Sequence, residues 1–83
     1  MQTYLIPSNS QKSFYNKAVV ITTNAMTVLK SYNTVIAMID KDTNKLTIYG
    51  WYSKTTALHL NSFLIQNGFK AMNKNEIINY KNN

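Results

Sequence analysis

The side chains that could do chemistry are few in this chain. It has 83 residues, a single histidine, His59, and no cysteine. A zinc site needs three or four ligands, and neither a cysteine nor a nearby carboxylate exists to complete one around His59. Ser53 or Ser62 could join His59 and Asp40 in a nucleophilic triad, but nothing resembles a nucleophile elbow and Ser53 is expected to cap a helix. We therefore predict no enzymatic activity, no catalytic residue, no cofactor and no bound metal.

The acidic residues do not build a site either. Asp40 and Asp42 are two of only three acids and fall in one turn, which is too little for paired-carboxylate hydrolysis. Residues 40–44 match the first five positions of a calcium loop. However, Lys45 stands where that loop needs glycine and Trp51 where it needs a bidentate glutamate. We therefore interpret this segment as a hairpin turn.

The charge of the chain points to an anionic partner. Nine basic residues against three acidic ones give a formal charge of +6, which favours nucleic acid or an acidic protein surface. Every basic residue is a lysine, so the planar fork with which arginine reads guanine or clamps phosphate is missing. The lysines are also spread singly along the chain, so charge alone argues only weakly for specific nucleic-acid binding.

Composition and length predict a single cytoplasmic domain, residues 1–83. A chain without cysteine fits a reducing compartment. Its start lacks the charged end and long apolar run of a signal peptide, and the apolar runs of the chain, such as 18–21, are far shorter than the ~20 residues of a membrane helix. A domain of this size buries only about 60% of its unfolded surface, so homodimerisation is one way it could gain stability.

The hydrophobic pattern predicts an α+β fold, in which a small antiparallel sheet of about four strands packs on one main helix. The strands are expected within 18–52, at 18–23, 26–32, 34–39 and 46–51. Residues 2–6 could add an edge strand, which Pro7 would end. The rest of 1–17 is interpreted as a polar arm. Both faces of 34–39 are apolar, which places that strand centrally in the sheet.

The main helix is the clearest element and is expected from Ser53 to Gly68. Ser53 is a good N-cap, Thr55 and Thr56 fill the first turn, and Gly68 supplies the left-handed residue that ends it. The face expected to lie on the sheet carries Thr56, Ala57, Leu60, Phe63, Leu64 and Asn67. His59 falls at the edge of this face, where we expect a bond to backbone or to a tyrosine hydroxyl.

Two apolar residues of this helix lie off its core face. Leu58 and Ile65 share a stripe nearly opposite the core residues. The segment 69–83 follows, with Phe69 folded back on the cap and a short helix expected over 73–80. We expect this segment to cover the stripe with Ile77, Ile78 or Tyr80, because large exposed apolar patches are uncommon. The alternative is that Leu58 and Ile65 form a homodimer or partner-binding face.

Aromatic residues of the last strand indicate a binding surface. Tyr49 and Trp51 point to one side of the strand, so they occupy the open face of the sheet if their neighbours face the helix, with Tyr32 beside them. The candidate partner-binding surface is Tyr32, Tyr49, Trp51, Lys30, Lys45 and Lys54. Such rings can anchor a protein contact, pack under the N-terminal arm or a symmetry mate, or stack unpaired bases. We rank these three roles in that order.

Three segments together resemble a known family. They are Ser31–Ala37, Leu46–Tyr49 and Tyr52–Leu60, followed by the pair Phe63-Leu64. The chain is similar to small, largely uncharacterised proteins of bacteriophages, prophages and plasmids, whose pattern is S-Y-x-T, a hairpin, then S-x-T-T-x-x-H opening a helix. The resemblance covers about residues 28–69. It implies a mobile-element accessory protein made in a bacterial host, and it brings no activity with it.

These observations lead to two functional hypotheses. The first is a non-enzymatic binding protein of a phage or mobile element that acts stoichiometrically on a host or phage macromolecule, most concretely a host-defence inhibitor of the anti-CRISPR kind. Many such inhibitors are acidic mimics of DNA, whereas this chain is basic, so its partner should be a protein or ribonucleoprotein with an acidic surface. The alternative is a small nucleic-acid-binding protein that holds single-stranded DNA or RNA with lysines and stacked aromatic rings.

Overall fold

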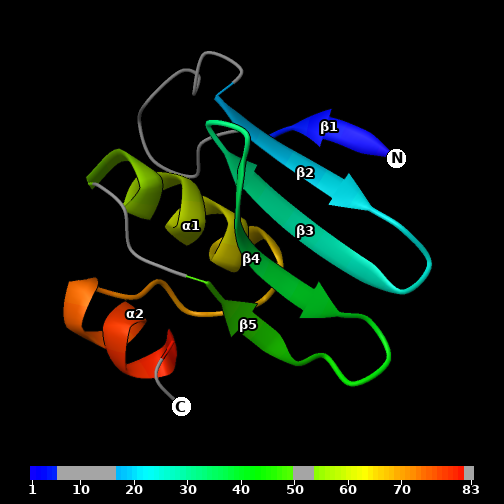
Figure 1. The fold of residues 1–83 in the computed structure, drawn as a ribbon. Helices are drawn as coiled ribbons and strands as arrows, with labels where there is room; N and C mark the ends of the chain where they lie inside the picture. Colours follow the sequence, from blue (N-terminus) through cyan, green and yellow to red (C-terminus); the bar gives the residue numbers. More distant parts are fainter. Residues whose placement is uncertain (6–16, 50–53, 82–83) are drawn as a thin grey trace.

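The protein is built from a five-stranded antiparallel sheet and two helices. The computed structural model describes residues 1–5, 17–49 and 54–81. In chain order the strands are β1 (Gln2–Tyr4), β2 (Ala18–Thr22), β3 (Met26–Ser31), β4 (Thr34–Asp40) and β5 (Leu46–Ile48), followed by α1 (Lys54–Gln66) and α2 (Lys74–Lys81). Each strand pairs with the next along the chain. In Figure 1, α1 lies on one face of the sheet, roughly along the strands, and α2 lies beside β5.

The predicted α+β class is therefore confirmed. The N-terminal edge strand forms as β1, so the sheet has five strands where about four were expected. The strand predicted over 34–39 is interior, with β3 and β5 as its neighbours. The last strand ends earlier than predicted, at Ile48, and Trp51 and the expected cap Ser53 lie outside the described residues.

Alternation along the strands separates two faces of the sheet. The face toward the helices is buried and includes Ala18, Leu29, Ala37, Leu46 and Ile48. The cross-strand register places a second set of residues on the opposite side, which we call the open face: Gln2, Val19, Ile21, Val28, Lys30, Val35, Met38 and Thr47. The side chains of this set are half-buried or exposed.

A β-bulge explains how β4 buries two successive residues. Leu29 pairs with Ala37, whereas Lys30 pairs with Val35, so Ile36 is the extra residue. Ile36 and Ala37 are consequently both buried, although alternation would send them to opposite faces. The apolar residues on both faces of this strand are therefore explained by the β-bulge as well as by the interior position of the strand in the sheet.

Helix α1 supplies the largest part of the core, with Leu60, Phe63 and Leu64 almost fully buried. It ends as predicted, because Gly68 adopts φ = +85°. The amide of Phe69 donates to the carbonyl of Leu64 at 2.8 Å and that of Gly68 to Ile65 at 3.3 Å, which is the Schellman pattern. Phe69 packs back on the core, as expected from the sequence.

Asn67 was predicted on the core face, and this was wrong. It is exposed at the end of α1, where its side-chain Nδ2 donates to the carbonyl of Phe63 at 2.7 Å. A side-chain amide near a helix C-terminus can bond a carbonyl that has no partner within the helix. Asn67 therefore caps the end of α1 and is not buried, although a helical wheel places it on the core face.

Polar contacts fix the start of the second helix, α2, and the connection that leads to it. A capping box opens it, in which the amide of Glu76 donates to Oδ1 of Asn73 at 2.9 Å and the amide of Asn73 donates to Oε1 of Glu76 at 3.0 Å. Asn61 of α1 clamps the preceding connection, because its side chain both donates to and accepts from the backbone of Met72. Ile77 then fills the core, and the hydroxyl of Tyr80 donates to the carbonyl of Leu46.

Neither described helix is long and apolar enough to cross a bilayer.

Candidate binding surface

His59 joins the helix to the sheet through a buried polar contact. Its Nδ1 and the Oγ of Ser31 share a hydrogen bond of 2.7 Å, and the two residues are only 1% and 2% exposed. Burial lowers the pKa of His59, because removing water disfavours the imidazolium form. The residue lies deeper than the helix–sheet boundary predicted from the sequence. A neutral imidazole held in this way is a structural tie.

A tight turn presents Tyr32 next to this tie. Tyr32 and Asn33 connect β3 to β4 with φ values of +51° and +66°, and a two-residue turn with positive φ at both positions is the type I′ hairpin geometry. Tyrosine is an unusual residue for that conformation, which normally selects glycine or asparagine. The turn is nonetheless well fixed, because the amide of Tyr32 donates to the carbonyl of Lys17 at 2.9 Å.

The Tyr32 ring also packs on His59. The two ring centroids are 5.7 Å apart, with the ring planes inclined at 34°, within the usual range for aromatic pairs. Tyr32 remains 52% exposed. The two parts of the S-Y-x-T and S-x-T-T-x-x-H pattern therefore meet in space, where Ser31 binds the histidine and Tyr32 covers it.

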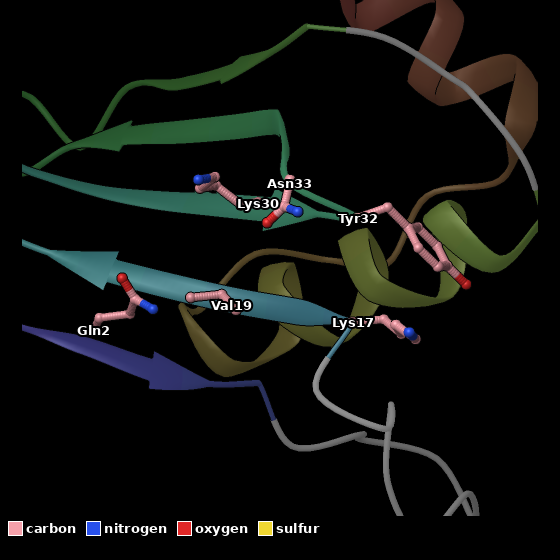
Figure 2. Close-up of a pocket in the computed structure, with 6 residues that line it drawn as sticks. All are labelled: Gln2, Lys17, Val19, Lys30, Tyr32 and Asn33. Carbon is pink, nitrogen blue, oxygen red and sulfur yellow. The ribbon is translucent and has the colours of Figure 1, made fainter.

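A hollow lies on the open face beside this turn and has a volume of about 310 Å³. We call it the hollow; it is lined by Gln2, Lys17, Val19, Lys30, Tyr32 and Asn33. Figure 2 shows Gln2, Val19 and Lys30 on neighbouring strands, with Asn33 leaning toward Lys30. Register places Val19 beside Lys30, because the two residues pair directly, whereas Figure 2 shows the Lys17 and Tyr32 side chains directed away from Lys30.

The charge around the hollow is entirely positive. Lys17 and Lys30 line it, and no acidic residue does. Asp40 pairs with Met26, which lies four residues before Lys30 on β3, or ~13 Å away at the rise of a strand. That separation exceeds the Debye length of ~8 Å at physiological salt. Asp40 is also engaged locally, since its Oδ1 accepts from the amides of Asp42 and Thr43.

The centre of the open face is aliphatic. Ile21, Val28 and Met38 are direct cross-strand neighbours, and we call these three the apolar row. Val35 and Met26 extend it and are 42% and 36% exposed. Among the described residues, both helices pack on the other face, so the apolar row is left to solvent by this part of the chain.

The residues predicted as one partner-binding surface are placed at several sites. Tyr32 and Lys30 both line the hollow, but Figure 2 shows their side chains directed away from one another. Tyr49 is exposed just after β5, and its amide donates to the carbonyl of Ile36 at 2.8 Å. Lys45 lies in the β4–β5 turn at the far end of the sheet, and Lys54 is exposed at the start of α1.

The stripe on α1 is not covered in the way the sequence suggested. Leu58 and Ile65 are 40% and 50% exposed, so the expectation that the C-terminal segment buries them was wrong. The reason is that α2 turns to the sheet instead. Its Ile77 is fully buried in the core, and Tyr80 is bonded to β5. The alternative, a face for a homodimer or partner, stays a prediction.

Sequence reasoning missed four of the six residues that line the hollow, namely Gln2, Lys17, Val19 and Asn33. The signal that could have found them is the pair Tyr32-Asn33, between two strands of matched length. Asparagine is a favoured turn residue, but the strand was predicted to run through Tyr32. Recognition of this hairpin would have placed Asn33 at the end of the sheet, close to Lys30 of β3.

Comparison with known proteins places the chain in a family. The family model of DUF8033, which describes sequences of a family of unknown function, matches residues 2–79. The chain therefore belongs to that family. No curated protein and no solved structure matches it.

Proposed function

We propose that this member of the DUF8033 family is a non-enzymatic binding protein of a phage or other mobile element, acting in the cytoplasm of a bacterial host. It binds a host or phage macromolecule stoichiometrically, and its most concrete role is inhibition of a host-defence system, of the anti-CRISPR kind. The partner is a protein or ribonucleoprotein with an acidic surface. The observation that carries the proposal is the apolar row on the open face.

The chemistry of the open face favours a protein contact. Interface centres are apolar and depleted in charge, with a polar rim, and the apolar row has that character with Thr47 and Gln2 at its ends. Lys30 and Lys17 add positive charge at one end, which complements an acidic surface and speeds encounter with it. Aliphatic side chains offer no ring for a base to stack on.

The polar side chains of the described residues support a role without catalysis. His59 is buried and bonded to Ser31, and its burial favours the neutral form. Asp40 holds its own turn through two backbone amides, and Glu76 holds the start of α2. A general acid or base must reach a substrate, whereas these groups are engaged in fixing the fold.

The experiment is a capture from lysate of a bacterial host, with partners identified by mass spectrometry. Three variants each add one carboxylate: Met38→Glu in the apolar row, Ile65→Glu on α1 and Asn79→Glu on the exposed side of α2. Each is first checked by thermal unfolding. We expect Met38→Glu to lose the captured partner and Asn79→Glu to retain it. Loss with Ile65→Glu alone would move the binding surface to the α1 stripe and reject the open face.

A functional assay tests the inhibitor role itself. Expression of the chain in a host that carries a CRISPR system should restore plaque formation by a targeted phage, and Met38→Glu should not. Titration of the purified target should reach full inhibition near equimolar protein, as a stoichiometric binder requires. Inhibition by a small fraction of an equivalent would indicate turnover and contradict the proposal.

A further inference from the structure

The end of α1 carries a chemically reactive pair, Asn67-Gly68. The chain is rich in asparagine, but only Asn67 is followed by glycine. The side-chain carbonyl carbon of an asparagine can be attacked by the backbone nitrogen of the next residue. Glycine hinders this attack least, because it has no Cβ beside the approaching atoms. Asn67 is also exposed, so water has access to the pair.

The backbone nitrogen of Gly68 is the most loosely held donor of the C-cap. It donates to the carbonyl of Ile65 at 3.3 Å, compared with 2.8 Å for the bond from Phe69 to Leu64. The longer bond exceeds the usual donor–acceptor range of about 2.7–3.2 Å. No atom would lie within 4 Å of a Cβ at Gly68. The reacting nitrogen is therefore weakly bonded, and its residue is not packed against the rest of the protein.

The closed cap nevertheless keeps the two reacting groups apart. The Nδ2 of Asn67 donates to the carbonyl of Phe63 at 2.7 Å, which directs the side-chain amide back along α1 and away from the nitrogen of Gly68. The last turn of a helix opens more readily than its middle, because it lacks part of its hydrogen bonds. Opening breaks the bond to Phe63 and lets the Asn67 side chain rotate toward Gly68. The rate of attack therefore depends on how often the C-cap opens.

We propose that Asn67-Gly68 is a site of spontaneous deamidation, through which the protein changes its own helix cap without an enzyme. The nitrogen of Gly68 loses its proton and bonds to Cγ of Asn67, the Cγ–Nδ2 bond breaks, and ammonia leaves. Water then opens the succinimide ring, at the side-chain carbonyl to give aspartate or at the backbone carbonyl to give isoaspartate. The net reaction consumes one water and releases one ammonia, so it needs no oxidant or cofactor.

Both products remove the contact that closes α1. An ionised carboxylate cannot donate to the carbonyl of Phe63, and it adds negative charge at the negative end of the helix dipole. The last turn of α1 has no basic residue to offset that charge. Isoaspartate also lengthens the backbone before Gly68, which disturbs the cap bonds of Gly68 and Phe69. Because ammonia is lost, each molecule that reacts keeps the weakened cap.

The test is prolonged incubation of the full chain in mildly alkaline buffer, with and without urea at concentrations below the unfolding transition. Peptide mapping by mass spectrometry locates each asparagine that becomes an acid, and chromatography separates aspartate from isoaspartate. Asn61 is the internal control, because its side chain is clamped to the backbone of Met72 and a serine follows it. Asn67→Gln is the matched variant, since its longer amide side chain must close a larger ring that forms more slowly.

We expect the intact Asn67 peptide of the wild-type protein to be lost first, to a mixture of aspartate and isoaspartate. The loss should be faster in urea, and faster at higher pH because the attacking nitrogen must lose its proton. The Asn67→Gln protein should stay intact over the same period. Asn67→Asp reproduces one product and should lower the midpoint of thermal unfolding by about 2–8 °C. Asn67→Ala lacks the donor without adding charge, so its midpoint should lie between those of wild type and Asn67→Asp.

Each result decides the proposal. Reaction of Asn61 or another asparagine before Asn67 would overturn it. Aspartate without isoaspartate would indicate direct attack by water and reject the role of Gly68. Equal rates with and without urea would show that opening of the cap does not control the reaction. An Asn67→Asp protein as stable as wild type would contradict the expected weakening of the cap. None of these results depends on the open face or on the proposed partner.

Discussion

The imidazole of His59 and the hydroxyl of Ser31 form a polar contact between α1 and the sheet, at 2.7 Å and almost out of solvent. Ser31 is the last residue of β3, directly before the turn that presents Tyr32. The contact therefore fixes the height of the helix over the sheet and the position of the turn at once. Its energetic value can be measured.

Replacing His59 by alanine should destabilise the protein by about 2–4 kcal/mol, because the change leaves the buried Ser31 hydroxyl without this partner and opens a cavity. Ser31→Ala should cost less, about 1–2 kcal/mol. The double variant should be more stable than the sum of the single effects implies, with a coupling of about 0.5–3 kcal/mol. Urea unfolding of the four proteins gives this value, and additive effects would contradict a direct coupling.

Stability should fall as the pH is lowered below the ordinary pKa of histidine, 6.5. Burial lowers the pKa of His59 in the folded state, so between 6.5 and that lower value the unfolded chain binds more protons than the folded one. Above 6.5 both states are neutral and the full stability is present. The measurement is the urea midpoint between about pH 7.5 and pH 5.5, a range above the titration of most carboxylates.

His59→Gln is the matched variant for this pH dependence, because glutamine can still hydrogen-bond but does not titrate. Its urea midpoint should vary less over the same range. If both proteins lose stability equally, the proton uptake belongs to another group.

Gly68→Ala should cost about 1 kcal/mol, the penalty of a left-handed backbone for a residue with a Cβ. The cost is conformational only, because a Cβ at Gly68 would meet no atom within 4 Å. Gly68→Asn should cost less, since asparagine tolerates this region. Thermal unfolding of the two variants gives the order, and an alanine variant as stable as wild type would show that the C-cap can relax.

Asn73→Ala should destabilise α2 by about 1 kcal/mol, because the amide of Glu76 loses its acceptor. The loss should be local, so amide hydrogen exchange is the sharper readout. Protection should drop for Ile77 and Ile78 and stay unchanged in β3. Asn75→Ala, two residues further along the chain and without a role in the capping box, is the control and should leave exchange in α2 as in wild type.

The parts of the fold that were predictable depend on local chemistry. Gly68 ends a helix wherever the left-handed region is needed, and a short helix was expected over 73–80, where the structure has α2. Alternating β-branched residues located the strands to within a few positions. These signals depend on a few neighbouring residues, and the structure confirms them.

The hollow was not predictable in the same way, because it depends on register. Lys17 and Lys30 are 13 residues apart in the chain and line the same hollow only because Ala18 pairs with Ser31 and Val19 with Lys30. A shift of one residue would turn every side chain of β2 to the other face. The β3–β4 turn beside it contains tyrosine where glycine or asparagine would be expected, so Tyr32 was interpreted as continued strand.

The exposure of Leu58 and Ile65 shows a second limit of prediction from the sequence. Their exposure depends on where α2 packs, which follows from the clamp between Asn61 and Met72. A helical wheel describes the faces of one helix but contains no information on the direction of the next. Such relations are set by side chain to backbone contacts between segments, which single-sequence periodicity does not report.

The two edge strands of the sheet are very short. β1 and β5 are the outer strands, and each has only three residues. Short edge strands offer few unpaired backbone groups to another chain, which protects against edge-to-edge aggregation and amyloid-like growth. The protein can therefore expose an aliphatic surface in a crowded cell while its sheet resists extension strand by strand. The proposed association would therefore use side chains across the flat of the sheet, where it can be specific.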